Sequence, residues 1–114
     1  MANGLRIIPE TLRSLDSTEF TGALQALGAP LEFASPLLKF INNSNVLVTI
    51  SWDGVNAHDV LPGNSFSLYD FSSDAGTISG LFAGKGTQFW VNGPVPGVNA
   101  GLVYLVSFYT SEDL

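Results

Sequence analysis

The chain has 114 residues, a formal net charge of −6 and no cysteine; 46% of its residues are hydrophobic and only 12% are charged. This length suits a single domain with its own core. Only four basic residues are present, scattered along the chain, which argues against nucleic acid as a partner because phosphate backbones are bound by clustered Lys and Arg. The absence of cysteine excludes disulfides and thiolate metal sites.

The low charge needs an explanation, because a small monomer has much surface to keep in water. One explanation is a β protein whose surface is rich in Ser, Thr, Asn and Gly. The other is that further subunits cover part of the apolar surface. No stretch reaches the roughly 20 apolar residues of a membrane helix, and the N-terminus lacks the apolar centre of a secretion signal. We therefore expect no membrane partner and a protein that is assembled in the cytoplasm.

Residues 1–18 form the least strand-like part of the chain. Leu5, Ile7 and Ile8 make a short apolar cluster that ends at Pro9. Such a segment suits an extended N-terminal arm that lies on a neighbouring subunit, for example by adding a strand to an exposed sheet edge. A frayed tail is the competing interpretation. The remaining residues, 19–114, are then expected to form one β-sandwich domain.

The centre of the chain predicts four short strands joined by tight turns, at residues 39–42, 46–52, 58–61 and 65–71. The turns contain Asn, Asp and Gly, which tolerate the positive φ that hairpin turns require. The second strand alternates strictly, which commits one of its faces to a core. The residues on that face are Val46, Val48, Ile50 and Trp52.

The flanking segments are less regular. Residues 19–27 could form a bent strand around Gly22, although the helix propensity of their second half opposes this. Residues 77–82 could form a short strand. Residues 87–92 predict a strand with Phe89 and Val91 on one face and Trp90 on the other, and a Gly- and Pro-rich surface loop follows at 93–101.

The last strand, residues 102–110, is apolar on both faces. A strand of this kind is usually central in a sheet or in contact with a partner. Eight or nine short strands with turn signals every 8–12 residues predict an all-β fold, namely an antiparallel β-sandwich or jelly roll. The two faces of the last strand comprise Leu102, Tyr104, Val106 and Phe108 on one side and Val103, Leu105 and Tyr109 on the other.

Residues with catalytic or metal-binding chemistry are few. His58, the only histidine, lies beside Asp59 and near Asp53, but a catalytic zinc usually has three protein ligands, and a structural role in the turn is the simpler interpretation. Calcium needs several converging carboxylates, whereas Asp70 and Asp74 also occur singly next to turns. We therefore expect no catalytic residue, no metal and no cofactor.

The aromatic residues allow two interpretations. Trp and Tyr are preferred anchors of subunit interfaces, and they also stack on sugars. The alternation places Trp52 in the core and Trp90 on the opposite side of its strand, so Trp90 is the stronger interface candidate. A sugar-binding platform would instead require Trp90 and the tyrosines to lie together on one concave face.

Three stretches taken together resemble small virion proteins of tailed bacteriophages: NNSNVLVTISWDG (42–54), HDVLPGNSFSLYDF (58–71) and GKGTQFWV (84–91). That group tends to show an Asn-rich strand entry, an S-x-D-G turn, a D-x-x-P-x-x-S-F strand entry and a late G-T-Q strand. The resemblance covers residues 36–110. Its motifs are structural turns, so they identify a sandwich better than a role.

The resemblance implies a non-enzymatic virion protein: a capsid cement or decoration protein, or a ring component at the head–tail junction. The expected partners are further copies of the chain, as a homo-oligomer, and capsid, portal or tail subunits. The alternative is a carbohydrate-binding or host-recognition module. The candidate interface residues are Leu5, Ile7, Ile8, Trp90, Leu105 and Tyr109.

Overall fold

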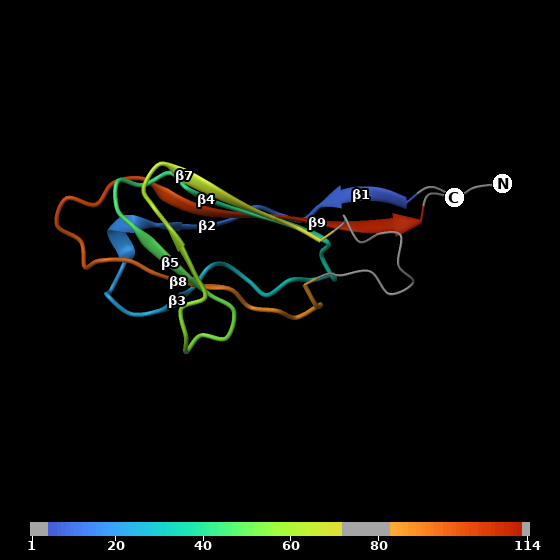
Figure 1. Ribbon diagram of the computed structural model, residues 1–114, viewed down its shortest axis with the longest axis horizontal. Coiled ribbons are helices and arrows are strands. Elements are labelled where there is room, and N and C mark those ends of the chain that lie inside the picture. The colour runs from blue at the N-terminus through green and yellow to red at the C-terminus, as the bar shows by residue number, and fades with distance from the viewer. Residues whose placement is uncertain (1–4, 72–82, 113–114) are drawn as a thin grey trace.

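The computed structural model describes residues 5–71 and 83–112. These residues form nine β-strands and one three-residue 3₁₀ helix, η1 (Ser17–Glu19). The strands make two antiparallel sheets that pack face to face (Figure 1). The predicted antiparallel β-sandwich is confirmed.

The larger sheet is built around β9 (Leu102–Glu112). β1 (Leu5–Pro9) and β2 (Arg13–Asp16) lie end to end along one side of β9, where β1 pairs with residues 108–112 and β2 with residues 102–105. β4 (Leu37–Asn42) pairs with the other side of β9, and β7 (Ser65–Asp70) pairs with β4 and forms the far edge.

The smaller sheet has the order β3–β8–β5–β6. Its strands are short: β3 (Gln25–Ala26), β8 (Trp90–Asn92), β5 (Val48–Ser51) and β6 (Asp59–Leu61). Because this sheet is shorter than β9, the pairing of β1 with the end of β9 continues beyond it as a two-stranded ribbon (Figure 1).

The four strands predicted in the centre of the chain are confirmed as β4 to β7, with ends that differ by at most two residues. The strand predicted at residues 19–27 is wrong, because only Gln25–Ala26 pairs there. Asp16 caps η1 by accepting a hydrogen bond from the Thr18 N–H, and Gly22 has a φ of +82°, so the backbone turns before a strand can form. The strand predicted at 77–82 lies outside the described residues.

The N-terminal segment is placed differently from the predicted arm. Residues 5–9 and 13–16 pair with β9 of the same chain. Arg13, only 7% exposed, forms an ion pair with Glu10 at 2.7 Å and donates hydrogen bonds to the carbonyls of Ala29 and Pro30. The Glu10 carboxylate in turn accepts the backbone N–H of Phe33. This buried ion pair binds the segment to the sandwich.

The core lies between the sheets and is almost entirely aliphatic and aromatic. Phe40 packs edge-on against Phe89, with ring centroids 5.3 Å apart. Alternate residues of each strand point inward, as the period of two requires. The side chains with no exposed surface include Leu27, Leu38, Phe40, Val48, Ile50, Val91, Val103 and Leu105.

Asn42 is the largest of the polar side chains that have no exposed surface. Its amide donates to the carbonyls of Val46 (2.8 Å) and Leu61 (2.9 Å), and its oxygen accepts the Ser44 N–H (3.0 Å). Every polar atom of the side chain is thus paired, as a buried amide requires. Asn42 therefore holds the Asn-rich turn against β6 and fixes how the chain passes from one sheet to the other.

Candidate functional site

The side of the larger sheet that faces away from the core is apolar. The registers place Lys39 between Leu68 and Val106, and Ile41 between Phe66 and Tyr104. All of these side chains point away from the smaller sheet. We call this surface the outer face; its apolar members are Leu37, Ile41, Phe66, Leu68, Tyr104, Val106 and Phe108.

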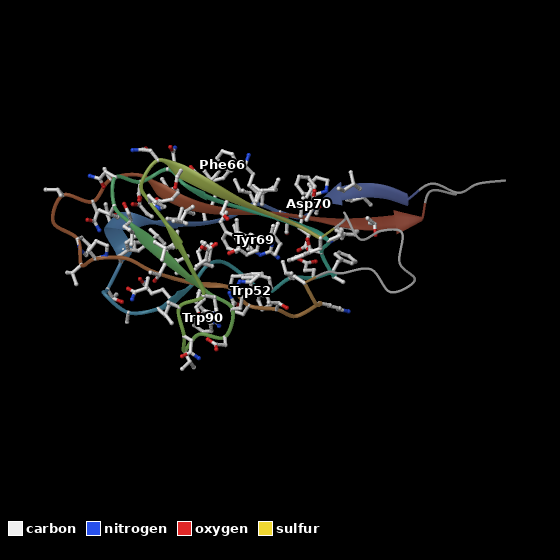
Figure 2. The ribbon with its side chains drawn as sticks, viewed as in Figure 1. Trp52, Phe66, Tyr69, Asp70 and Trp90 are labelled. Atoms are coloured by element: carbon white, nitrogen blue, oxygen red, sulfur yellow. The ribbon has the colours of Figure 1, made fainter. Side chains whose placement is uncertain are left out.

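Several of these side chains are well exposed. Phe66 is 63% exposed and Leu68 is 53% exposed, and Figure 2 shows Phe66 on the side of the sheet away from the core. The Lys39 ammonium lies 4.7 Å from the centroid of the Phe66 ring. At the other side of the sheet, Ile7 of β1 points the same way as Phe108 and is 52% exposed. Single exposed apolar residues are ordinary, but a contiguous apolar sheet face indicates a binding surface.

The prediction that Leu105 lies in an interface is wrong. Leu105 has no exposed surface, and the inner face of β9 comprises Val103, Leu105 and Ser107. The polar Ser107 can face inward because its hydroxyl accepts a hydrogen bond from Arg13 at 3.1 Å. The more apolar face of β9 is therefore the one that points outward.

The other predicted interface residues are dispersed. The side chain of Leu5 lies outside the described part of the structure. Ile8 is half-buried and opposite Tyr109 in the β1–β9 ribbon, and Tyr109 stacks on Phe33 with centroids 3.9 Å apart. Of the predicted residues whose side chains the structure describes, Ile7 alone is placed on the outer face.

Trp90 lies on the outer side of the smaller sheet, as its alternation with Phe89 and Val91 predicted. Its indole ring lies against the turn that follows β5 (Figure 2). A Cβ added to Gly54 would lie 2.8 Å from Cε2 of Trp90, so only glycine permits this contact. Trp90 therefore anchors a turn of its own chain, and its role in a subunit interface stays a prediction.

A second aromatic cluster closes the sandwich between β6 and β7. Trp52 is partly buried against the core and stacks on Tyr69, with centroids 5.7 Å apart. The Tyr69 hydroxyl donates a hydrogen bond to the carboxylate of Asp59. Burial, together with this carboxylate, raises the pKa of Tyr69 above its usual value. Tyr69 therefore remains a protonated donor that links the two sheets (Figure 2).

The His58–Asp53 pair serves the turn after β5. Nδ1 of His58 accepts the Trp52 N–H at 3.0 Å, and Nε2 lies 3.8 Å from Asp53 Oδ2. Hydrogen bonds from the Asn56 and Val55 N–H groups hold the pKa of Asp53 well below its usual range. Both side chains are engaged in shaping the loop. Among the described residues, no three His, Asp or Glu side chains converge as a metal site would require.

One shallow depression of about 290 Å³ lies outside the smaller sheet. Small-molecule sites are usually enclosed and carry several convergent polar groups. Here the polar side chains are those of Thr49 and Asn92, and the Thr49 hydroxyl already donates to the carbonyl of Asn92 at 3.4 Å. The depression is lined by Gly22, Leu47, Thr49, Asn92, Gly93 and Pro94.

The aromatic side chains considered for sugar stacking lie on separate surfaces. Trp90 is outside the smaller sheet, Tyr69 is between the sheets and Tyr104 is on the outer face. Sequence reasoning missed Phe66 and Leu68 as surface residues. The alternation of Ser and apolar residues in SFSLYD was the signal that could have identified Phe66 and Leu68. A strand with one buried face shows this alternation whichever of its faces is buried, so the pattern does not say which side is exposed.

Comparison with known proteins identifies no relative: no family model, no curated protein and no solved structure matches the chain. In the part of the chain that the structure describes, no helix has the length and apolar character needed to cross a membrane.

Proposed function

We propose that this chain is a non-enzymatic structural subunit of a tailed-bacteriophage virion, acting through protein interfaces as a capsid cement or decoration protein or as a head–tail junction component. The observation that carries the assembly role is the apolar outer face of the larger sheet, with Phe66 and Leu68 more than half exposed. The virion context comes from the sequence resemblance over residues 36–110.

The energetics favour a partner on this face. Burying half of a large apolar side chain is worth about 1 kcal/mol, so a face with several such residues can supply a specific interface. The charged side chains of β4 and β7 on this face are Lys39 and Asp70, and the Lys39 ammonium lies over the Phe66 ring, a contact that offsets part of the cost of desolvating it. The side chains best placed to act in catalysis, His58 and Asp53, are committed to a turn.

The test compares two substitutions of equal exposure on opposite sides of the sandwich. Ile7 on the outer face and Val60 outside the smaller sheet are each 52% exposed. We expect the wild-type chain to form a defined oligomer at micromolar concentration, Ile7→Lys to lower its native mass, and Val60→Lys to leave the mass unchanged. Light scattering after size exclusion measures all three.

A wild-type chain that stays monomeric, or an oligomer that Ile7→Lys and Val60→Lys weaken equally, would contradict the proposal. Circular dichroism and thermal unfolding of both variants provide the control for folding. Since both residues are on the surface, each substitution should change the free energy of unfolding by no more than about 0.5 kcal/mol.

A further inference from the structure

The larger sheet has two different edges. One edge consists of β1 and β2, which are short, separated by residues 10–12, and include Pro9. The other is β7, a six-residue strand without Pro, Gly or Lys. Among residues 5–71 and 83–112, no strand pairs with the outer side of β7. Interruptions, Pro and Lys are the usual means of protecting an edge from pairing, and β7 has none of them.

The hydrogen bonds next to β7 show which backbone groups face outward. The Phe71 N–H donates to the Pro36 carbonyl at 2.8 Å, and the Asn43 N–H donates to the Leu102 carbonyl at 2.9 Å. In an antiparallel ladder, alternate residues point to the same neighbour. Even-numbered residues of β4 therefore bond to β7. The register pairs them with odd-numbered residues of β7, so Phe66 and Leu68 direct their backbone N–H and C=O groups toward the open edge.

The sequence of β7 is complementary to itself. Directly opposed residues of an antiparallel pair share a face of the sheet. If Ser67 lies opposite Ser67 of a second copy, Phe66 of each chain lies opposite Leu68 of the other. These two apolar pairs are also the ones whose outward N–H and C=O groups can bond. Shifting the pairing so that Leu68 lies opposite itself would instead place Phe66 opposite Asp70.

β7 is also held in a strand conformation before any partner arrives. On its inner side, Tyr69 is bonded to Asp59 and stacked on Trp52. At its start, the Ser65 hydroxyl donates to the Pro62 carbonyl. Binding to a strand that is already ordered avoids most of the entropy cost of ordering it.

We propose that β7 pairs antiparallel with β7 of a second copy of this chain, about a twofold axis at Ser67. The two larger sheets then form one continuous sheet, and their outer faces become one apolar surface of double width. This inference names a partner for the assembly subunit proposed above and rests on that proposal. Because each chain carries a net charge of −6, added salt should strengthen the pairing.

The test uses the absence of cysteine from the chain. Ser67→Cys is introduced into the Ile7→Lys background, which weakens the outer-face contact at β1, and the position of the cross-link then reports on β7 pairing. Residues opposed in a non-hydrogen-bonded pair have Cα atoms about 4.5 Å apart, within disulfide range. We expect a dimer by light scattering and rapid disulfide formation under mild oxidation.

Two matched cysteine variants control the position and the register. Ser14→Cys, at the exposed position of β2 on the opposite edge, should cross-link at least tenfold more slowly. Leu68→Cys should also be slow, since Leu68 lies opposite Phe66 of the second copy; fast cross-linking there instead of at position 67 would overturn the register. Leu68→Lys, which needs no oxidation, should convert the dimer to a monomer, whereas Val60→Lys should not.

The outcomes separate the two proposals. If the chain is monomeric in the Ile7→Lys background and cross-links equally at positions 67 and 14, β7 pairing is overturned. The loss of native mass caused by Ile7→Lys then still supports the outer-face interface. A dimer that cross-links at 67 while Ile7→Lys has no effect on the wild-type mass supports β7 pairing and contradicts the outer-face interface.

Discussion

The inner and outer faces of the larger sheet are built from the same strands but differ in how they are used. On β4 and β9, the inner face contains Asn42 and Ser107, while the outer face carries Lys39 among apolar side chains. Both faces are largely apolar, so apolar character by itself does not distinguish the core. What distinguishes the inner face is that its polar groups have partners inside the sandwich, whereas the outer face has exposed apolar surface without a covering layer in the described residues.

The sharpest comparison of the two faces is between two phenylalanines on adjacent strands. Phe40 has no exposed surface, and Phe66 is 63% exposed. Phe40→Ala should lower the free energy of unfolding by about 3–5 kcal/mol, because it leaves a cavity in the core. Phe66→Ala should change it by about 0.5 kcal/mol or less under dilute, monomeric conditions. Urea denaturation followed by tryptophan fluorescence measures both. Similar losses in the two variants would show that the outer face is packed.

The buried Arg13–Glu10 ion pair tests how the N-terminal strands are held. Arg13→Met should lower the free energy of unfolding by about 3 kcal/mol, since it leaves the Glu10 carboxylate buried without its cation. Adding Glu10→Gln should recover part of the loss. Hydrogen exchange should show that protection is lost first in β1 and β2. Uniform loss across the sandwich would mean that these strands do not unfold as a separate unit.

A smaller effect is expected in the turn that supports Trp90. The pKa of Asp53 is lowered in the folded state by N–H donors, so its contribution to stability is present above the unfolded value of 3.8 and is lost as the pH falls below it. Asp53→Asn should therefore differ most from wild type near neutral pH and converge with it in acid. Urea midpoints at about pH 7 and about pH 3 measure this. A difference in urea midpoint that does not depend on pH would mean that the effect comes from the amide introduced by Asp53→Asn and not from the loss of the carboxylate charge.

The central hairpins were predictable because their information is local. Asn, Asp and Gly at the turns and the strict alternation of Val46–Trp52 determine where strands begin, end and face. The inward direction of Val48 and Ile50 and the separation of Phe89 from Trp90 followed from the same period of two.

The sequence alone determined the class of fold and the order of its turns, since these depend on neighbours a few residues apart. Only the tertiary structure decided which face of β9 is buried, because Ser107 becomes an inner residue through Arg13, 94 positions away. The same holds for residues 5–16, whose place in the sheet depends on the ion pair and on the loop at Ala29 and Pro30. Long-range pairing of polar groups, more than apolar character, selected the inner face and left the outer one exposed.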